Sequence, residues 1–226
     1  MSAEQSQQKR HKKVVIFGAE QFASLAYYVL THDSPHAVMG FTVDAAWCRT
    51  STLHDLPVVP FDHLEQYFPP EDYALLISLG WTDCNGLRAA KYAEGKARGY
   101  SFVTYVSSRA LVWPDLQVGE NSMIYEAANI QPFARIGNNC ILRNGCNVSH
   151  HAIIGNHVFL AAHAIVAGGA MVGERCFLGL NSTIRDGVKV APHCIIAAGA
   201  LVTADTEPDG LYLGVPARRH PLPKNL

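Results

Sequence analysis

An aliphatic residue recurs at every sixth position through the second half of the chain. The run is unbroken over fifteen positions: Val118, Ile124, Ile130, Ile136, Leu142, Val148, Ile154, Leu160, Val166, Val172, Leu178, Ile184, Val190, Ile196 and Val202. The residue four positions after each of these anchors is nearly always small or β-branched. Two inward-facing positions in every six predict a short strand followed by a bend. A short, fixed period of this kind predicts a parallel β-solenoid, whose coils bury their apolar faces only by stacking.

The composition of the 226 residues, of which 49% are hydrophobic, allows two modest domains with cores of their own. A formal net charge of −1 gives no basic footprint, so we expect no nucleic-acid partner. No apolar stretch is long enough to insert into a membrane. Four of the six cysteines take the small inward position of the repeat, which predicts packing and a cytoplasmic location: Cys140, Cys146, Cys176 and Cys194.

The first half reads as a small α/β domain. Residues 1–12 are polar and predict a disordered leader, residues 13–105 a Rossmann-like domain, and residues 106–226 the solenoid with a C-terminal tail. Apolar segments predict strands at 13–17, 37–43, 56–59 and 73–79, helices after Gly18 and over 85–98, and a run at 100–106 that leads into the first coil. This alternation is typical of a doubly wound sheet.

The turn after the first strand only partly matches a dinucleotide-binding fingerprint. Gly18 and Ala23 fit the pattern G-x-G-x-x-G/A, but Glu20 replaces the glycine that lets the backbone approach a pyrophosphate. Fewer than about 100 residues precede the repeat, roughly one mononucleotide half of such a fold. A nucleoside diphosphate therefore fits better than NAD. The alternative is a domain that packs against the solenoid and binds nothing.

The two halves together resemble the bacterial nucleotide-sugar acetyltransferases, in which a short Rossmann-like domain precedes a left-handed β-helix of hexapeptide repeats. The matching segments are HAIIG at 151–155, AGG at 167–169, FLGLNS at 177–182 and GVPA at 214–217. Relatives include the bacillosamine-pathway N-acetyltransferase and the sialic acid O-acetyltransferases. The resemblance implies a homotrimer that transfers acetyl from acetyl-CoA to the amino group of a nucleotide-linked amino sugar, without a metal, in surface glycan biosynthesis.

The resemblance also implies a set of site residues. His151 would be the general base, and the backbone N–H of Gly168 would stabilise the oxyanion. The candidates for the nucleotide sugar are Glu20, Gln21, Phe22, Asp44 and Gly80, with Asn144 added because it precedes His151 by seven residues. The candidates for acetyl-CoA are His163, Gly168, Leu180, Ala198 and Gly214.

Two positions depart from the pattern of the relatives. Ala152 follows the base where an acidic residue is usual, and Phe159 stands where many relatives have a second histidine. His163, four residues later, is the candidate to take over that second polar role, and His150 competes with His151 for the role of base.

The spacing of the histidines predicts where the site is assembled. His151, His157 and His163 are six residues apart, so they occupy successive edges of a triangular coil and cannot meet within one subunit. A site between the subunits of a trimer follows.

Other functions remain open. A zinc enzyme of the carbonic anhydrase type is the first, with His157 and His193 as the widely separated pair of ligands. A sugar O-acetyltransferase and a non-catalytic trimeric scaffold are the others. Ala152 in place of the acid favours an amino sugar over a hydroxyl acceptor, since an amine needs less help from its base.

Overall fold

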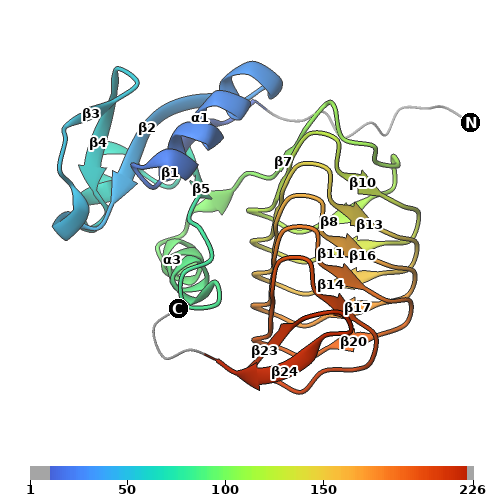
Figure 1. The fold of residues 1–226 in the computed structure, drawn as a ribbon. Coiled ribbons are helices and arrows are strands. Elements are labelled where there is room, and N and C mark those ends of the chain that lie inside the picture. The colour runs from blue at the N-terminus through green and yellow to red at the C-terminus, as the bar shows by residue number, and fades with distance from the viewer. Residues whose placement is uncertain (1–10, 223–226) are drawn as a thin grey trace, which may run out of the picture.

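The computed structural model describes residues 11–222. It consists of an α/β domain beside a stack of triangular coils (Figure 1). The predicted leader at 1–12 lies outside the described residues except for its last two. Within the described residues, no helix is long and apolar enough to cross a membrane.

The α/β domain has a six-stranded sheet in the order β3-β4-β2-β1-β5-β6. Its elements are β1 (Lys13–Phe17), α1 (Gln21–Asp33), β2 (Ala37–Val43), η1 (Ala45–Trp47), β3 (Thr52–Leu53), β4 (Leu56–Pro60), η2 (Phe61–His63), α2 (Leu64–Tyr67), β5 (Tyr73–Ile77), α3 (Gly86–Ala97) and β6 (Ser101–Phe102). All pairings are parallel except β3 with β4. The chain builds outward from β1 through β2 and then returns to β5 on the other side. The carboxyl ends of β1 and β5 therefore flank the point where ligands bind in such sheets.

Every predicted hexad forms a two-residue strand. These strands are β8 (Gln117–Val118), β9 (Met123–Ile124), β10 (Asn129–Ile130), β11 (Arg135–Ile136), β12 (Ile141–Leu142), β13 (Asn147–Val148), β14 (Ile153–Ile154), β15 (Phe159–Leu160), β16 (Ile165–Val166), β17 (Met171–Val172), β18 (Phe177–Leu178), β19 (Thr183–Ile184), β20 (Lys189–Val190), β21 (Ile195–Ile196) and β22 (Leu201–Val202). Each strand pairs in parallel with the strand eighteen residues away, as Asn129 does with Asn147. Three hexads therefore make one coil, and the anchors with the small inward residues form one continuous core.

The coils present three flat sheets. We call β8, β11, β14, β17 and β20 the first sheet, β9, β12, β15, β18 and β21 with β7 (Tyr105–Val106) the second, and β10, β13, β16, β19 and β22 the third. An antiparallel pair, β23 (Gly210–Leu213) and β24 (Arg218–Pro221), extends the second sheet at the C-terminal end. The four predicted inward cysteines are buried, and all six cysteines are free.

The corners between sheets turn through one residue in the left-handed region. The third residue after an anchor has a φ between 54° and 69° at Asn121, Ala127, Phe133, Asn139, Gly145, His151, His157, His163, Gly169, Arg175, Asn181, Gly187, His193 and Gly199. Glycine, asparagine and histidine are the residue types that tolerate this conformation best. The backbone thus provides one reason for histidines spaced by six.

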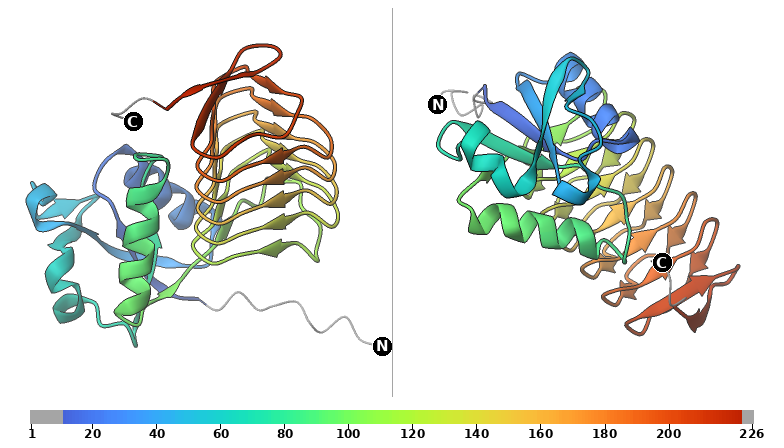
Figure 2. Two further views of the ribbon diagram at one scale, coloured as in Figure 1. Left: turned by 90° about the horizontal axis from the view of Figure 1, so that it is seen from below. Right: turned by 90° about the vertical axis from the view of Figure 1, so that its left-hand side faces the viewer.

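The α/β domain packs against the second sheet (Figures 1 and 2). Outward residues of that sheet, among them Met123, Ile141 and Phe159, share a core with Val14 and Ile16 of β1. Phe159, which replaces the second histidine of many relatives, is only 3% exposed and has a packing role.

Several predicted elements differ in detail from the structure. The expected run at 100–106 is interrupted, because β6 pairs with β5 whereas β7 pairs with β9 of the solenoid. The strand predicted at 73–79 ends at Ile77, since Ser78 turns to donate its hydroxyl to the Phe22 carbonyl. The short elements β3, η1, η2 and α2 were not predicted by the apolar pattern, because they bury few side chains.

Candidate active site

His150 and His151 lie on the corner between the third and first sheets, which we call the His150 corner. Both side chains are exposed, and their Nδ1 atoms are 3.3 Å apart. The ring of His151 lies over Phe133 of the preceding coil, with the centroids 4.7 Å apart. The structure therefore brings the two candidate bases into direct contact.

Gly168, on the next coil of the same corner, provides the space for the His150 ring. A Cβ atom on Gly168 would lie 2.7 Å from Cε1 of His150 and 2.9 Å from its Nε2, so a larger residue would displace the ring. The Gly168 N–H donates to Oδ1 of Asp186 at 2.9 Å. The predicted oxyanion donor thus lies beside His150, but a carboxylate occupies it in this structure.

The Nδ1 contact fixes how the pair can carry protons. One Nδ1 must donate and the other must accept, so in the neutral pair one ring presents a free Nε2 and the other an Nε2–H. Ala152 is fully buried in the solenoid core, so the position after His151 offers no polar group to either imidazole. An orienting partner for one histidine is therefore supplied by the other histidine.

The acetyl-CoA candidates His163, Leu180 and Ala198 lie on a different corner together with the sugar candidate Asn144, whereas the acetyl-CoA candidate Gly168 lies beside His150. Asn144, His163, Leu180 and Ala198 belong to successive coils of the corner between the second and third sheets, the His163 corner. The ring of His163 lies against Gly145, where a Cβ would come within 2.5 Å of it. Backbone bonds such as His163 N–H to Asn144 O, at 3.2 Å, hold the coils together. One protomer therefore does not bring Asn144 to His151.

Gly214 follows β23 at the C-terminal end of the solenoid. Its carbonyl accepts a hydrogen bond from the N–H of Leu201 at 3.1 Å, and its φ of 95° favours glycine. Gly214 therefore lies at the C-terminal end of the stack, next to the last coil, which also contains Ala198.

The predicted nucleotide residues gather at the carboxyl ends of β1 and β5. Glu20 is the exposed N-cap of α1 and makes no side-chain capping bond, Gln21 begins the helix, and the ring of Phe22 lies 3.6 Å from where a Cβ of Gly80 would be. Asp44 directly follows the neighbouring strand β2, and its carboxylate forms an ion pair with Lys91 of α3. Four of the five residues therefore share one edge, while Asp44 is engaged elsewhere.

Arg143 was not predicted, yet it points from the solenoid toward this edge. Its Cζ lies 4.3 Å from the ring centroid of Tyr125 and 5.8 Å from that of Phe22. Its Nη1 is buried without a hydrogen-bond partner. In sequence it is merely the outward residue after the anchor Leu142, and only the domain packing reveals its position.

The corner between the first and second sheets, the His157 corner, is sealed by α3. Arg88 is fully buried and donates to the carbonyls of Asn139 at 3.2 Å and His157 at 3.0 Å. Nδ1 of His157 contacts Nδ2 of Asn139 at 2.8 Å, and burial with the nearby Arg88 charge lowers the pKa of His157. His193, the other proposed zinc ligand, pairs with Asp209 at 3.2 Å. Within residues 11–222 no three metal-ligating side chains cluster.

Comparisons with known proteins cover both parts of the chain. The model of the hexapeptide repeat of succinyl-transferase matches residues 169–204. A histidine-to-asparagine mutant of perosamine N-acetyltransferase from Caulobacter crescentus, solved with CoA and GDP-perosamine, is 26% identical, with a TM-score of 0.84 over 92% of this chain and 96% of that one. No curated protein sequence matches the chain.

Two further solved structures agree with the same fold. The acetyltransferase domain of PglB from Neisseria gonorrhoeae is 19% identical, with a TM-score of 0.81 over 93% of this chain and all of that one. WeeI from Acinetobacter baumannii is 19% identical, with a TM-score of 0.78 over 92% of this chain and 100% of that one. The repeat, the coils and the likeness over both domains confirm the predicted fold. The chain thus contains a hexapeptide-repeat segment and is similar over both domains to acetyltransferases that have this fold.

Proposed function

We propose that the protein transfers an acetyl group from acetyl-CoA to the amino group of a nucleotide-linked amino sugar. The observation that carries this proposal is the likeness to perosamine N-acetyltransferase bound to CoA and GDP-perosamine, which extends over both domains. A shared β-helix alone would indicate only the fold. The additional α/β domain, whose sheet edge carries Glu20, Gln21 and Phe22, supports a substrate that has a nucleotide part.

The chemistry is direct acyl transfer. The amine nitrogen attacks the thioester carbonyl carbon, the C–S bond breaks, and the CoA thiolate leaves while an imidazole takes the proton from nitrogen. The register of the repeat predicted His151 as this base. We assign proton acceptance to His150 and orientation to His151, because the His150 ring is the one beside Gly168. With Nδ1–H of His150 donated to His151, Nε2 of His150 is free to accept.

The oxyanion requires a donor close to the base. The N–H of Gly168 fits this role if the thioester oxygen replaces Oδ1 of Asp186 as its acceptor. Asp186 then keeps that N–H hydrogen-bonded until the substrate arrives.

A homotrimer completes the site in this proposal. The two histidines and Gly168 lie on the His150 corner, and the acetyl-CoA candidates His163, Leu180 and Ala198 lie on the His163 corner. A cleft that joins both groups therefore needs two protomers side by side. Exposed apolar side chains beside the His150 corner support such a contact, with Ile153 at 37%, Ile165 at 38% and Met171 at 41% exposure. Six free cysteines favour a reducing compartment, and we propose the cytoplasm.

The nucleotide part is proposed to lie between α1 and Arg143. The uncapped N-terminus of α1 and a guanidinium without an ion pair in the described residues both favour a diphosphate. Arg143 also offsets the repulsion that the carboxylate of Glu20 would impose.

The test is a panel of UDP-, dTDP- and GDP-linked 3-amino and 4-amino sugars with acetyl-CoA, following release of free thiol. The corresponding hydroxyl sugars serve as the control for O-acetylation. We expect turnover with at least one amino sugar and none with its hydroxyl counterpart. Thiol release that depends on no sugar, or only on hydroxyl sugars, would contradict the proposal.

A further inference from the structure

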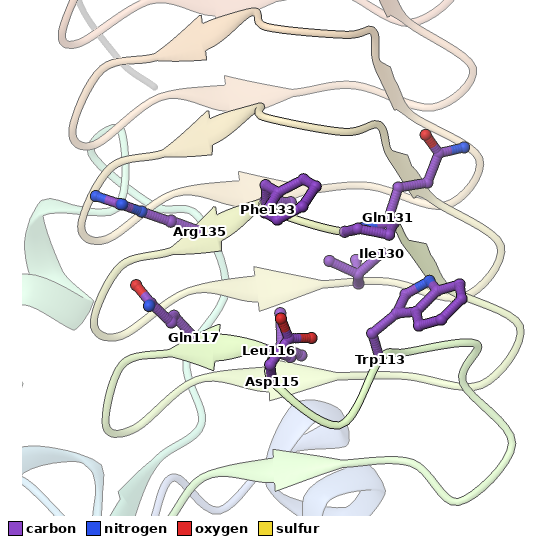
Figure 3. Close-up of a pocket in the computed structure, with 10 residues that line it drawn as sticks. Trp113, Asp115, Leu116, Gln117, Ile130, Gln131, Phe133 and Arg135 are labelled. Atoms are coloured by element: carbon purple, nitrogen blue, oxygen red, sulfur yellow. The ribbon is translucent and has the colours of Figure 1, made fainter.

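A pocket of about 100 Å³ lies on the His150 corner, one coil toward the N-terminus from the histidine pair. Figure 3 shows Trp113 and Asp115 on one coil, and Phe133 and Arg135 on the next. None of these residues was a candidate on sequence grounds.

The pocket is joined to the histidine pair through two of its own residues. The ring of Phe133 is 4.7 Å from that of His151, centroid to centroid. Oε1 of Gln131, another lining residue, accepts a hydrogen bond from the N–H of His150 at 3.0 Å. A group bound in the pocket is therefore adjacent to the histidine pair.

The lining has the chemistry of a carbohydrate site. Trp113 is 56% and Phe133 is 66% exposed, an unusual exposure for side chains of this size, and their rings can cover the C–H face of a pyranose. Asp115 and Arg135 are exposed, and no ion pair is formed by either within residues 11–222. Their carboxylate and guanidinium are free to bond sugar hydroxyls.

The order of the pocket, the histidine pair and Gly168 along the His150 corner indicates from which direction each substrate approaches. The pocket lies on the coil before the histidine pair, and Gly168 lies on the coil after it. We infer that this pocket binds the sugar ring of the acceptor, so that the amine reaches the pair from the N-terminal side and the thioester from the C-terminal side. The inference rests on the proposed function and adds residues that select the sugar.

The nucleotide would enter from a neighbouring protomer. The protomer's own α/β domain covers the second sheet, whereas the pocket shares Leu116, Gln117 and Arg135 with a shallow, open hollow on the first sheet. A nucleotide held by the adjacent α/β domain could reach the pocket across that hollow.

The test compares Trp113→Ala and Trp113→Phe with Tyr67→Ala, an equally exposed aromatic residue on α2 of the α/β domain. GDP-perosamine is the first probe, followed by the sugar that the wild type acetylates fastest in the panel. For Trp113→Ala we expect the KM of the sugar to rise about tenfold. The KM of acetyl-CoA and the calorimetric Kd of GDP alone should stay unchanged. Trp113→Phe should recover most of the loss, and Tyr67→Ala should match the wild type.

Three results would overturn the inference. An unchanged KM for the sugar would remove the pocket from recognition. A rise shared equally by acetyl-CoA, or a change in oligomeric state on gel filtration, would make Trp113 a cofactor or subunit contact instead. A wild type that acetylates no nucleotide-linked amino sugar would refute the proposed function first, and the inference with it.

Discussion

The His157 and His150 corners have the same backbone and opposite surroundings. His157 and His151 both adopt a left-handed conformation, with φ values of 61° and 59°. His157 is held between Asn139 and the fully buried Arg88, whereas His151 is exposed and contacts His150 and Phe133. The repeat places a histidine on each of these two corners, and the α/β domain covers only the His157 corner.

The difference shows how one repeat acquires two roles. At the His157 corner the α/β domain contributes Arg88, which donates to three backbone carbonyls, and the His157 ring packs beside this interface against Asn139. At the His150 corner both imidazoles are exposed among residues 11–222, which leaves them accessible to a substrate. Four substitutions test this contrast, and they are given in order of decreasing effect.

The largest effect is expected from Arg88→Met. The guanidinium donates to Gly80 O, Asn85 Oδ1 and three carbonyls of the His157 corner, and its loss leaves these buried acceptors unpaired. We expect the free energy of unfolding to fall by roughly 3–5 kcal/mol in urea titrations. The exposed Arg49→Met is the control, with a change within about 0.5 kcal/mol. A similar small change for Arg88→Met would mean that the corner is not sealed by this residue.

At the open corner, His150→Ala should lower kcat by at least about 10²-fold, because the base is removed while the exposed position keeps the fold intact. Thiol release with the best amino sugar measures the loss. His151→Ala should retain more activity than His150→Ala, and the distant His63→Ala should match the wild type. The reverse order of the first two would return the role of base to His151.

Gly168→Ala is expected to lower kcat about tenfold by displacing the ring of His150, whose Cε1 would lie 2.7 Å from the new Cβ. The effect should largely vanish when the same change is made in His150→Ala, since Gly168 then has no ring to accommodate. Additive losses in the double variant would show that Gly168 acts independently of His150, for example as the oxyanion donor alone.

The smallest effect concerns the stability of the sealed corner in acid. Burial lowers the pKa of His157 below its ordinary value of about 6.5. As the pH falls, this imidazole is therefore protonated in the unfolded chain before it is protonated in the folded chain. This residue therefore costs stability as the pH falls below about 6.5, by up to about 1.4 kcal/mol per pH unit. His157→Asn, which also tolerates the left-handed turn, should flatten that slope in urea unfolding between pH 7 and 5.5. His151→Asn is the matched control, and equal slopes for wild type and His157→Asn would refute the account.

The solenoid was predictable because its order is local. Each hexad repeats the same pattern of an aliphatic residue and a small residue, and the pairing of strands eighteen residues apart follows from this period. The strands β1, β2 and β4 were also visible as apolar runs, while β3 and the break between β6 and β7 were not, since these depend on pairing with distant strands.

The candidate site divides in the same way. The sequence by itself determined the histidine corner, Gly168 on the next coil, and the separation of His151, His157 and His163, because all of these follow from register. Only the tertiary structure decided that His150 and His151 pair, that Arg88 seals one corner, that Arg143 lies near the Phe22 ring, and that Trp113 lines a pocket. The physical reason is that periodicity fixes which way a side chain leaves the coil, whereas its partners come from segments that the period does not encode.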